Sequence, residues 1–487
     1  MLKKFLKSNF LLVIAVLFIF LRLPSLFEPY WYDDEGIYLT IGQALNRGVK
    51  LYSQIHDNKP PLLYLMAAFS KTVFGFRLLL FFVMIPTVYF FHKLAKKFVS
   101  GGLQKIATFV FIILSCIPLL EGNIANAEIF MLLPTLAAFT IYITAAKPLH
   151  YLVSGLLLGL SFMIKAPAAL EVGTIIFWET SCLLDQKAFK REIIPFAKRV
   201  ALLLGGFFVP LVLCSLYFLA NGGFNYFIYA SLLQNFGYLS SWSIGTHSGS
   251  ALSGGLALRL LVLFVLLAVG YISKVSKKID AKTFMITSWF AFSLFGSLLS
   301  GRPYPHYLIE IIPPLSILVV HLFGKYKTFT KLIIVLYFAV FAGAIVKYKF
   351  YFYRTVSYYA NFYSYVLGFK SKDEFNNYFG WHVPENYQIS EFLKNNTVPD
   401  DKIFIWGDRA SIYALSNRPP QARFTTAYHI VDFNGYDETI EKFKIDLPKV
   451  IIYYNMPGRD FPQLDLFIKK YYYLAVKIGD ALIYRSR

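Results

Sequence analysis

The sequence predicts a polytopic α-helical membrane protein that carries a small C-terminal α/β domain. Hydrophobic residues make up 57% of the 487 residues and charged residues only 16%, whereas a soluble domain carries about 25% charge. The mean hydropathy is +0.52. The apolar residues fall in runs of roughly 20, the length that an α-helix needs to cross about 30 Å of hydrocarbon.

Roughly eleven of these runs predict transmembrane helices. The first, residues 9–27, follows a short basic segment, as the apolar region of a signal peptide would. Its length, and the lack of a small-residue cleavage site after it, favour an uncleaved first span. A shorter apolar segment from Pro60 to about Gly75 predicts a helix in the membrane interface. The other predicted spans are residues 76–92, 103–120, 128–146, 150–164, 167–184, 200–220, 255–273, 283–300, 307–323 and 332–347.

The positive charges are sorted between the loops. In a soluble protein the net charge of +20 would suggest nucleic acid, but here the cations lie in short loops between apolar runs. We therefore expect anionic membrane lipids as partners and no nucleic acid. The pattern predicts a multi-pass cell-membrane protein with a cytoplasmic N-terminus, and an odd number of spans places the tail outside. The cationic side holds Lys3, Lys4, Lys7, Lys93, Lys96, Lys97, Lys105, Lys187, Lys190, Arg191, Lys198, Arg199, Lys274, Lys277, Lys278, Lys282, Lys325, Lys327 and Lys331. The opposite side holds 28–60, 121–127, 221–254 and 301–306.

The tail differs in composition from the rest of the chain. Asp, Glu and Asn become common, and short β-like runs alternate with helix-like segments, which predicts an α/β domain. The predicted domains are a transmembrane module, 1–347, and an extracytoplasmic α/β domain, 348–487. The predicted strands are 402–406, 450–454, 471–476 and 481–484, and the predicted helical segments are 389–395 and 440–443.

The first outer loop, residues 28–60, carries three adjacent carboxylates, Asp33, Asp34 and Glu35. A solvated loop beside an aromatic belt is one explanation. The residues that follow favour a functional one, because their spacing predicts an amphipathic helix that begins at the acids and lies on the membrane. Asp33 or Asp34 would cap this helix, and a fixed carboxylate there could deprotonate a hydroxyl. The apolar positions at helical spacing are Ile37, Ile41 and Leu45.

Cationic side chains occur at two other outer positions. Lys59 precedes Pro60 and Pro61, which fix the entry into the next helix and hold the ammonium at the interface, where it can pair with a phosphate. A snorkelling lysine is the alternative. Arg302 and His306 lie in a loop stiffened by two prolines, and the guanidinium suits bidentate phosphate binding. An ordinary loop arginine with an interfacial histidine is the alternative.

Two further ionisable residues lie at the outer ends of predicted spans. Glu128 opens one span and Lys165 lies in a short outer turn, and ionisable groups at such depth are candidates for function. No nucleotide-binding glycine loop, HExxH pair or metal-spaced Cys/His cluster is present in the sequence. Any chemistry is therefore expected outside, where a lipid-borne donor would be available.

Three longer stretches complete the pattern: Gly155–Lys165 (GLLLGLSFMIK), Arg302–Pro314 (RPYPHYLIEIIPP) and Ile403–Pro420 (IFIWGDRASIYALSNRPP). Together with Asp34-Glu35 and Lys59-Pro60-Pro61, they make the chain similar to the GT-C superfamily of membrane glycosyltransferases. The chain most resembles the protein-mannosyltransferase-like branch, which includes the lipid A aminoarabinose transferase and the RgtA/B/C/D-like enzymes. The resemblance runs over nearly the whole chain.

The resemblance implies inverting transfer of a hexosyl or pentosyl group from a polyprenyl-phosphate-linked donor. The acceptor would be a hydroxyl of a glycan, lipid or protein on the outer face. The family's catalytic Asp-Glu pair falls on Asp34 and Glu35, with Asp33 as a neighbour. A carboxylate would activate the acceptor, and cations would stabilise the charge on the leaving phosphate. The candidate phosphate-binding residues are Lys59, Lys165, Arg302 and His306.

A divalent metal (Mg²⁺, Mn²⁺ or Zn²⁺) could share the role of these cations, with Asp34, Glu128 and Asp57 as candidate ligands. Two rival functions remain open. A transporter or flippase of lipid-linked glycans should place paired ionisable groups near the midplane, often with inverted repeats. A non-catalytic assembly protein would leave the acidic segment unexplained.

Overall fold

The computed structural model describes residues 9–185, 189–234 and 255–487. The predicted cytoplasmic residues Lys3, Lys4, Lys7 and Lys187 lie outside the described residues. The chain forms two compact units, each assembled from separate segments. Unit 1 comprises Met1–Leu23, Leu80–Tyr217 and Ser231–Thr355, and unit 2 comprises Pro24–Leu79, Phe218–Ala230 and Val356–Arg487. The domain boundary expected near residue 347 stays a prediction. The compact units divide the chain differently, because Pro24–Leu79 belongs to the same unit as the tail.

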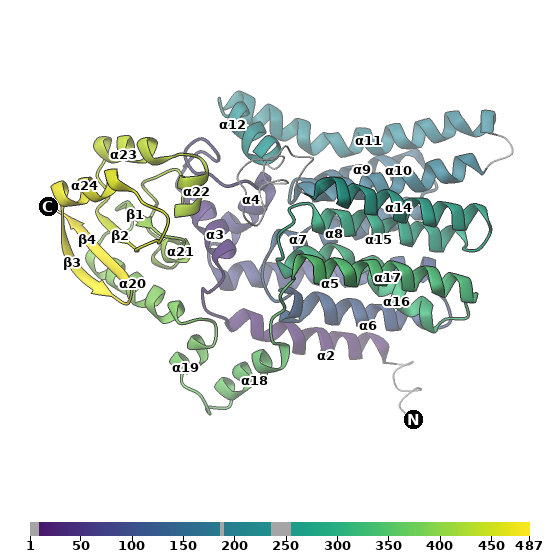
Figure 1. The fold of residues 1–487 in the computed structure, drawn as a ribbon, viewed down its shortest axis with the longest axis horizontal. Coiled ribbons are helices and arrows are strands. Elements are labelled where there is room, and N and C mark those ends of the chain that lie inside the picture. The colour runs from purple at the N-terminus through teal and green to yellow at the C-terminus, as the bar shows by residue number, and fades with distance from the viewer. Residues whose placement is uncertain (1–8, 186–188, 235–254) are drawn as a thin grey trace. The chain divides into compact units, whose positions relative to one another are not determined.

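Unit 1 is a bundle of helices (Figure 1). Its α-helices are α2 (Phe10–Arg22), α5 (Val73–Phe98, whose first residues belong to unit 2), α6 (Leu103–Cys116), α7 (Ala127–Phe130), α8 (Leu132–Ile143), α9 (Pro148–Phe162), α10 (Ala169–Leu184), α11 (Phe189–Ala220), α14 (Leu256–Val275), α15 (Ala281–Leu298), α16 (Ile312–Phe323) and α17 (Thr328–Tyr348). Its 3₁₀ turns are η2 (Pro118–Leu120), η3 (Ala166–Ala168) and η5 (Pro305–Ile311), and a further turn, η1 (Leu23–Phe27), begins in unit 1 and continues into unit 2.

Each of the roughly eleven predicted spans coincides with one of these helices or with a helix and its adjoining turn. Within the described ranges, six helical stretches are long and apolar enough to cross a membrane, and shorter apolar helices accompany them. The polytopic helical membrane architecture is confirmed.

Small residues allow two of these helices to pack closely. A methyl group at Gly155 of α9 would lie 1.9 Å from the carbonyl oxygen of Leu203 in α11. A methyl group at Gly206 of α11 would lie 2.0 Å from the carbonyl oxygen of Leu152 in α9. The backbones therefore approach through glycines, as membrane helices often do. This packing explains the glycines at the start of the GLLLGLSFMIK stretch.

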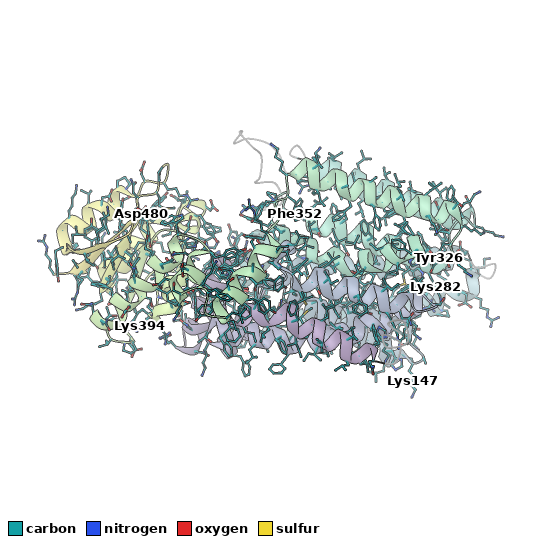
Figure 2. The ribbon with its side chains drawn as sticks, turned by 90° about the horizontal axis from the view of Figure 1, so that it is seen from below. Lys147, Lys282, Tyr326, Phe352, Lys394 and Asp480 are labelled. Atoms are coloured by element: carbon teal, nitrogen blue, oxygen red, sulfur yellow. The ribbon has the colours of Figure 1, made fainter. Side chains whose placement is uncertain are left out.

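Loops of like charge meet at one end of unit 1. The loops from α14 to α15 and from α16 to α17 lie at the same end (Figure 1), and they carry Lys277 and Lys325 among other cations. Lys147 and Lys282 also lie there, whereas Phe352 lies at the opposite end (Figure 2). The sorting of charge between two ends agrees with the predicted sidedness, and the orientation of the termini in the cell stays a prediction.

Unit 2 joins the first outer loop to an α/β domain. Its helices are α3 (Asp33–Asn46), α4 (Pro61–Ser70), α12 (Phe224–Ile228), the π-helical turn η4 (Tyr229–Leu233, which continues into unit 1), α18 (Thr355–Val366), α19 (Lys372–Asn377), α20 (His382–Asn396), α21 (Ser411–Ser416), α22 (Ala427–Asp432), α23 (Tyr436–Ile445) and α24 (Pro462–Tyr471). Its strands are β1 (Ile403–Trp406), β2 (Val450–Tyr453), β3 (Tyr472–Ile478) and β4 (Ala481–Ser486).

The strands form one sheet in the order β1-β2-β4-β3. β1 pairs with β2 in parallel, and the other pairs are antiparallel, so the sheet is mixed. Two buried apolar clusters contain residues of its strands, one around Trp406 and Phe461 and the other around Ile405 and Ile452. All four predicted strands are confirmed, and the predicted helical segments fall within α20 and α23.

Candidate functional site

The acidic segment begins helix α3, which is buried on two sides. It packs against α4 and α21. A methyl group at Gly36 would lie 2.5 Å from Ser411 Oγ in α21, and one at Gly42 would lie 2.5 Å from the backbone nitrogen of Ala68 in α4. The predicted helix is confirmed, and it packs between α4 and α21. Its position on the membrane stays a prediction.

The helix cap differs from the expectation. The N-cap is Tyr32, whose side chain makes no capping bond. Asp33, Asp34 and Glu35 instead occupy the first turn. Their side chains therefore lie at the positive end of the helix dipole.

Glu35 is held in a buried ion pair. Arg77 of α5 donates from Nε to Glu35 Oε1 at 2.8 Å and from Nη2 to Glu35 Oε2. Nη1 of the same guanidinium lies 3.0 Å from Glu28 Oε2, and Tyr358 donates to Glu28 Oε1. Arg77 is fully buried and Glu35 is 1% exposed. Both carboxylate oxygens of Glu35 therefore accept from one buried guanidinium.

Asp34 and Lys59 lie beside the same tyrosine. Tyr38, one turn along α3, donates its hydroxyl to Asp34 Oδ2 at 3.2 Å. Lys59 Nζ lies 5.2 Å from the centroid of the Tyr38 ring, within the range of a cation–π contact. Asp34 is half-buried, and the Lys59 side chain is 24% exposed. The Asp34 carboxylate and the Lys59 ammonium are thus both partly accessible to solvent, and both contact Tyr38.

The backbone at Lys59 is held by two buried tyrosines. Tyr52 donates its hydroxyl to the carbonyl oxygen of Lys59 at 2.7 Å, and the amide of Lys59 donates to the Tyr64 hydroxyl at 3.0 Å. Pro60 then forms the N-cap of α4, with Pro61 as its first residue. The predicted role of the prolines at the entry to this helix is confirmed.

The Asp57 carboxylate lies between the side chains of Lys59 and His429. It accepts from the Tyr64 hydroxyl at 2.8 Å and lies 3.9 Å from Lys59 Nζ and 3.8 Å from His429 Nε2. Burial alone would raise the pKa of Asp57, but Lys59, His429 and the hydrogen bonds from Asn58 and Tyr64 outweigh it and hold the pKa below its usual value.

Asp33 lies on the wall of a cavity of about 650 Å³ within unit 2. Burial raises the pKa of Asp33, Arg409 lowers it, and the like charges of Asp34 and Asp408 add to the increase, so the pKa is about 7. Asp33 Oδ1 is buried and hydrogen-bonds to none of the described residues.

Unit 1 holds a second group of ionisable residues, the lysine–glutamate cluster: Glu121, Glu128, Lys165, His306 and Glu310. Lys165 Nζ contacts Glu128 Oε1 and lies 3.4 Å from Glu310 Oε1. His306 pairs with Glu121 through Nδ1, and its Nε2 lies 3.5 Å from Glu128. The structure thus brings three predicted residues together, and two carboxylates constrain the Lys165 ammonium.

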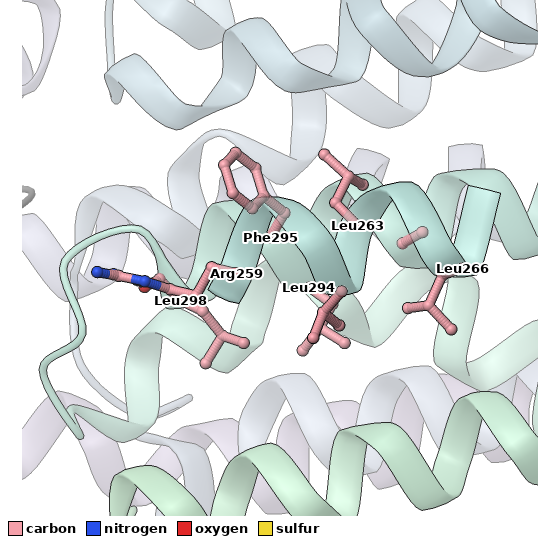
Figure 3. A pocket seen from close by; sticks show the side chains of 8 residues that line it. Arg259, Leu263, Leu266, Leu294, Phe295 and Leu298 are labelled. Atoms are coloured by element: carbon pink, nitrogen blue, oxygen red, sulfur yellow. Dashed lines mark hydrogen bonds between the residues drawn. The ribbon is translucent and has the colours of Figure 1, made fainter. Parts of the chain in front are cut away.

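Arg302 follows Gly301, whose φ is +66°, and its amide donates to Ser300 Oγ at 3.2 Å. A second arginine supports the same end of α15, since Arg259 donates from Nη1 to the carbonyl oxygens of Leu298 and Leu299. A small apolar cavity lies along α14 beside Arg259 (Figure 3). Its volume of about 10 Å³ suits at most one water molecule.

The metal candidates have cationic or hydrogen-bonding neighbours. Among the described residues no group of three or more His, Cys, Asp or Glu side chains could hold a metal ion. Asp57 faces Lys59 and His429, and Glu128 faces Lys165. These donor sets suit ion pairs better than metal ligation.

Several neighbours of the candidate residues were not predicted from the sequence. They include Arg77, Glu28, Tyr38 and His429. The sequence does contain a signal for Arg77, because a lone arginine in an apolar run needs a buried partner. It contains no signal that pairs His429 with Asp57, because the two residues lie far apart along the chain.

No family model matches the sequence, and no curated protein matches it in sequence. Solved structures do match. ArnT from Cupriavidus metallidurans bound to undecaprenyl phosphate aligns with a TM-score of 0.60 and 12% identity, over 98% of this chain and 98% of that chain. The apo structure of the same ArnT gives 0.57 and 13%, over 98% of each chain.

A more distant likeness is the archaeal oligosaccharyltransferase AglB from Archaeoglobus fulgidus in complex with an inhibitory peptide and a dolichol-phosphate. It aligns with a TM-score of 0.49 and 13% identity, over 100% of this chain and 74% of that chain. The likeness to ArnT over its full length defines the class of fold: the chain is a multi-pass membrane protein with the GT-C fold. The resemblance expected from the sequence is confirmed at the level of the fold.

Proposed function

We propose that the protein is a glycosyltransferase that moves a sugar from a polyprenyl-phosphate-linked donor to a hydroxyl of a glycan, lipid or protein acceptor, on the outer face of the membrane. The observation that carries the proposal is the placing of Asp34 and Lys59 beside the Tyr38 ring. This arrangement supplies a base and a phosphate-neutralising cation in one place. The ArnT of similar fold is bound to undecaprenyl phosphate, a carrier of the proposed kind.

The proposed step needs no separate acid. The acceptor oxygen attacks the anomeric carbon, and its proton passes to Asp34. The bond from the anomeric carbon to the phosphate oxygen breaks, and the electron pair stays on the polyprenyl phosphate. Lys59 stabilises the charge that grows there. Because the acceptor enters opposite the departing phosphate, the configuration of the sugar is inverted.

Geometry favours Asp34 among the three adjacent acids. Both oxygens of Glu35 are bound by Arg77. Asp33 lies in a cavity wall, and its pKa near 7 leaves it less ionised than an ordinary aspartate. Asp34 is half-buried and accepts a hydrogen bond from the Tyr38 hydroxyl. This bond orients the carboxylate of Asp34 and brings no positive charge to it.

The cations of unit 1 take separate roles in the proposal. Arg302 remains a candidate ligand of the donor phosphate. His306 and Lys165 are constrained by Glu121, Glu128 and Glu310, so they act by ordering the loops that carry them.

The test uses the chain of 487 residues in lipid nanodiscs, with a panel of polyprenyl-phosphate sugars as donors and a membrane extract of the producing cells as acceptor. Release of polyprenyl phosphate is measured. Asp34→Asn should lower turnover by about 10²–10⁴-fold, as for loss of a general base, and should retain binding of undecaprenyl phosphate. Asp437→Asn is the matched control, since Asp437 is an exposed aspartate in the first turn of α23.

No transfer by the wild type with any donor would overturn the proposal and favour a transporter of lipid-linked glycans. Normal turnover in Asp34→Asn with loss in Asp33→Asn would move the base by one residue.

A further inference from the structure

The cavity beside Asp33 is not used by the proposed transfer step. It lies within unit 2, and its volume of about 650 Å³ is within the ~300–1,000 Å³ typical of small-molecule sites. Residues from the start of α3, from the turn before α20, from the end of β1 and from the β2 and β3–β4 region contribute to it. They are Asp33, Trp381, Asp408, Arg409, Tyr454, Asn455, Met456, Lys477, Asp480 and Leu482.

The lining combines an accessible aromatic ring with planar polar groups. Trp381 is 64% exposed, and the Arg409 guanidinium lies 5.6 Å from its ring centroid. The amide of Asn455 and the carboxylates of Asp408 and Asp480 offer donors and acceptors. Sugars present apolar C–H faces and a ring of hydroxyls, so they suit a wall of this kind.

One carboxylate of the wall is fixed before any ligand arrives. Asp408 Oδ2 accepts from Arg459 Nη1 at 2.5 Å, and Asp408 Oδ1 accepts from the amide of Tyr428 at 3.1 Å. A group held in this way loses little freedom when it binds a hydroxyl, which improves affinity.

Asp33 connects the cavity to the proposed base. Its Oδ1 is buried without a hydrogen-bond partner among the described residues, and a buried polar atom without a partner gains free energy when a ligand supplies one. Asp33 and Asp34 are consecutive residues in the first turn of α3. The two side chains point in different directions, but their Cα atoms are only about 3.8 Å apart, so a molecule of several sugar units held against Asp33 could extend to Asp34.

We propose that this cavity binds the carbohydrate part of the acceptor, and that Asp33 positions the acceptor hydroxyl rather than removing its proton. The role of the bound carbohydrate as the acceptor rests on the proposed function. Binding of carbohydrate in the cavity does not depend on it. A lipid chain suits the cavity less, because six of the ten lining residues carry charged or amide side chains. A phosphate suits it less, because three carboxylates face two cations.

Binding is tested on the full chain in nanodiscs, which avoids sugar-based detergents. Saturation-transfer NMR is recorded with maltose, cellobiose, mannobiose and chitobiose. Trp381→Ala should weaken the binding of at least one of these about 2- to 10-fold, as expected for one lost aromatic contact. Phe369→Ala is the matched control, because Phe369 is a 79% exposed aromatic residue of the same unit outside the cavity lining. Asp480→Asn, at an exposed position, provides a second variant with little risk to folding.

The transfer assay supplies an independent readout. Trp381→Ala and Asp33→Asn should raise the KM for the acceptor and leave the KM for the donor unchanged. Sugar binding that is lost in Trp381→Ala supports the cavity even if no transfer is found, in which case only the enzymatic proposal fails. Transfer with no sugar binding and an unchanged acceptor KM in both variants would overturn the cavity assignment alone.

Discussion

Removal of the Arg77 guanidinium should destabilise the protein strongly. Arg77 is fully buried and lies between Glu28 and Glu35, which are 6% and 1% exposed. Arg77→Leu leaves both carboxylates buried without their cation. Breaking a buried pair in this way costs about 3–5 kcal/mol. Since Glu35 belongs to the first turn of α3, the same change should displace Asp34 and abolish transfer.

The assay heats the purified protein and measures the folded fraction by size-exclusion chromatography. Arg77→Lys keeps the charge without the planar fork, so its loss should be smaller. The triple variant with Arg77→Leu, Glu28→Gln and Glu35→Gln removes the unpaired charges and should recover much of the stability. If Arg77→Leu stays within about 1 kcal/mol of the wild type, the magnitude expected for a buried pair is refuted.

Four other outcomes are expected. Lys59→Ala or Arg302→Ala should weaken binding of undecaprenyl phosphate roughly tenfold, as for one lost charged hydrogen bond, and unchanged binding in titrations of both would mark them as snorkelling cations. Gly42→Ala should lower the melting temperature, since its methyl group would lie 2.5 Å from α4 backbone, and normal melting would contradict the packing. The folded pKa of Asp33, about 7, exceeds its unfolded value, so the free energy of unfolding should fall as the pH rises through about 4 to 7. The melting temperature of Asp33→Asn should depend less on pH in this range. A protease site inserted after Pro399 should be cut on intact cells; cleavage only after lysis would reverse the topology.

The sequence predicts the elements of this fold well, because their signals are local. A run of roughly 20 apolar residues marks a span wherever its partners lie, and short β-rich runs mark the strands of the tail. The caps and pairings are less local. Tyr32 caps α3 in place of an aspartate, and α21, which covers the helix, comes from a segment far along the chain.

The candidate residues show the same division. The sequence identifies Asp34 and Lys59 as candidates from their neighbours, and the two lie on one tyrosine ring. It cannot distinguish Glu35 from Asp34, because that distinction depends on Arg77, 42 positions away. Such a partner is fixed by the tertiary structure of unit 2, to which Arg77 and Glu35 both belong, and no spacing in the sequence encodes it.

The packing of α21 on α3 has a consequence for biosynthesis. Thr40 of α3 donates its hydroxyl to the carbonyl oxygen of Ala410, 370 positions later, at 3.1 Å. At a translation rate of ~5–20 residues per second, the ribosome needs roughly 20–70 s to make that partner. During this interval the side of α3 that carries Gly36, Thr40 and Gln43 has no cover from α21, so α3 completes its packing only after the last quarter of the protein has emerged.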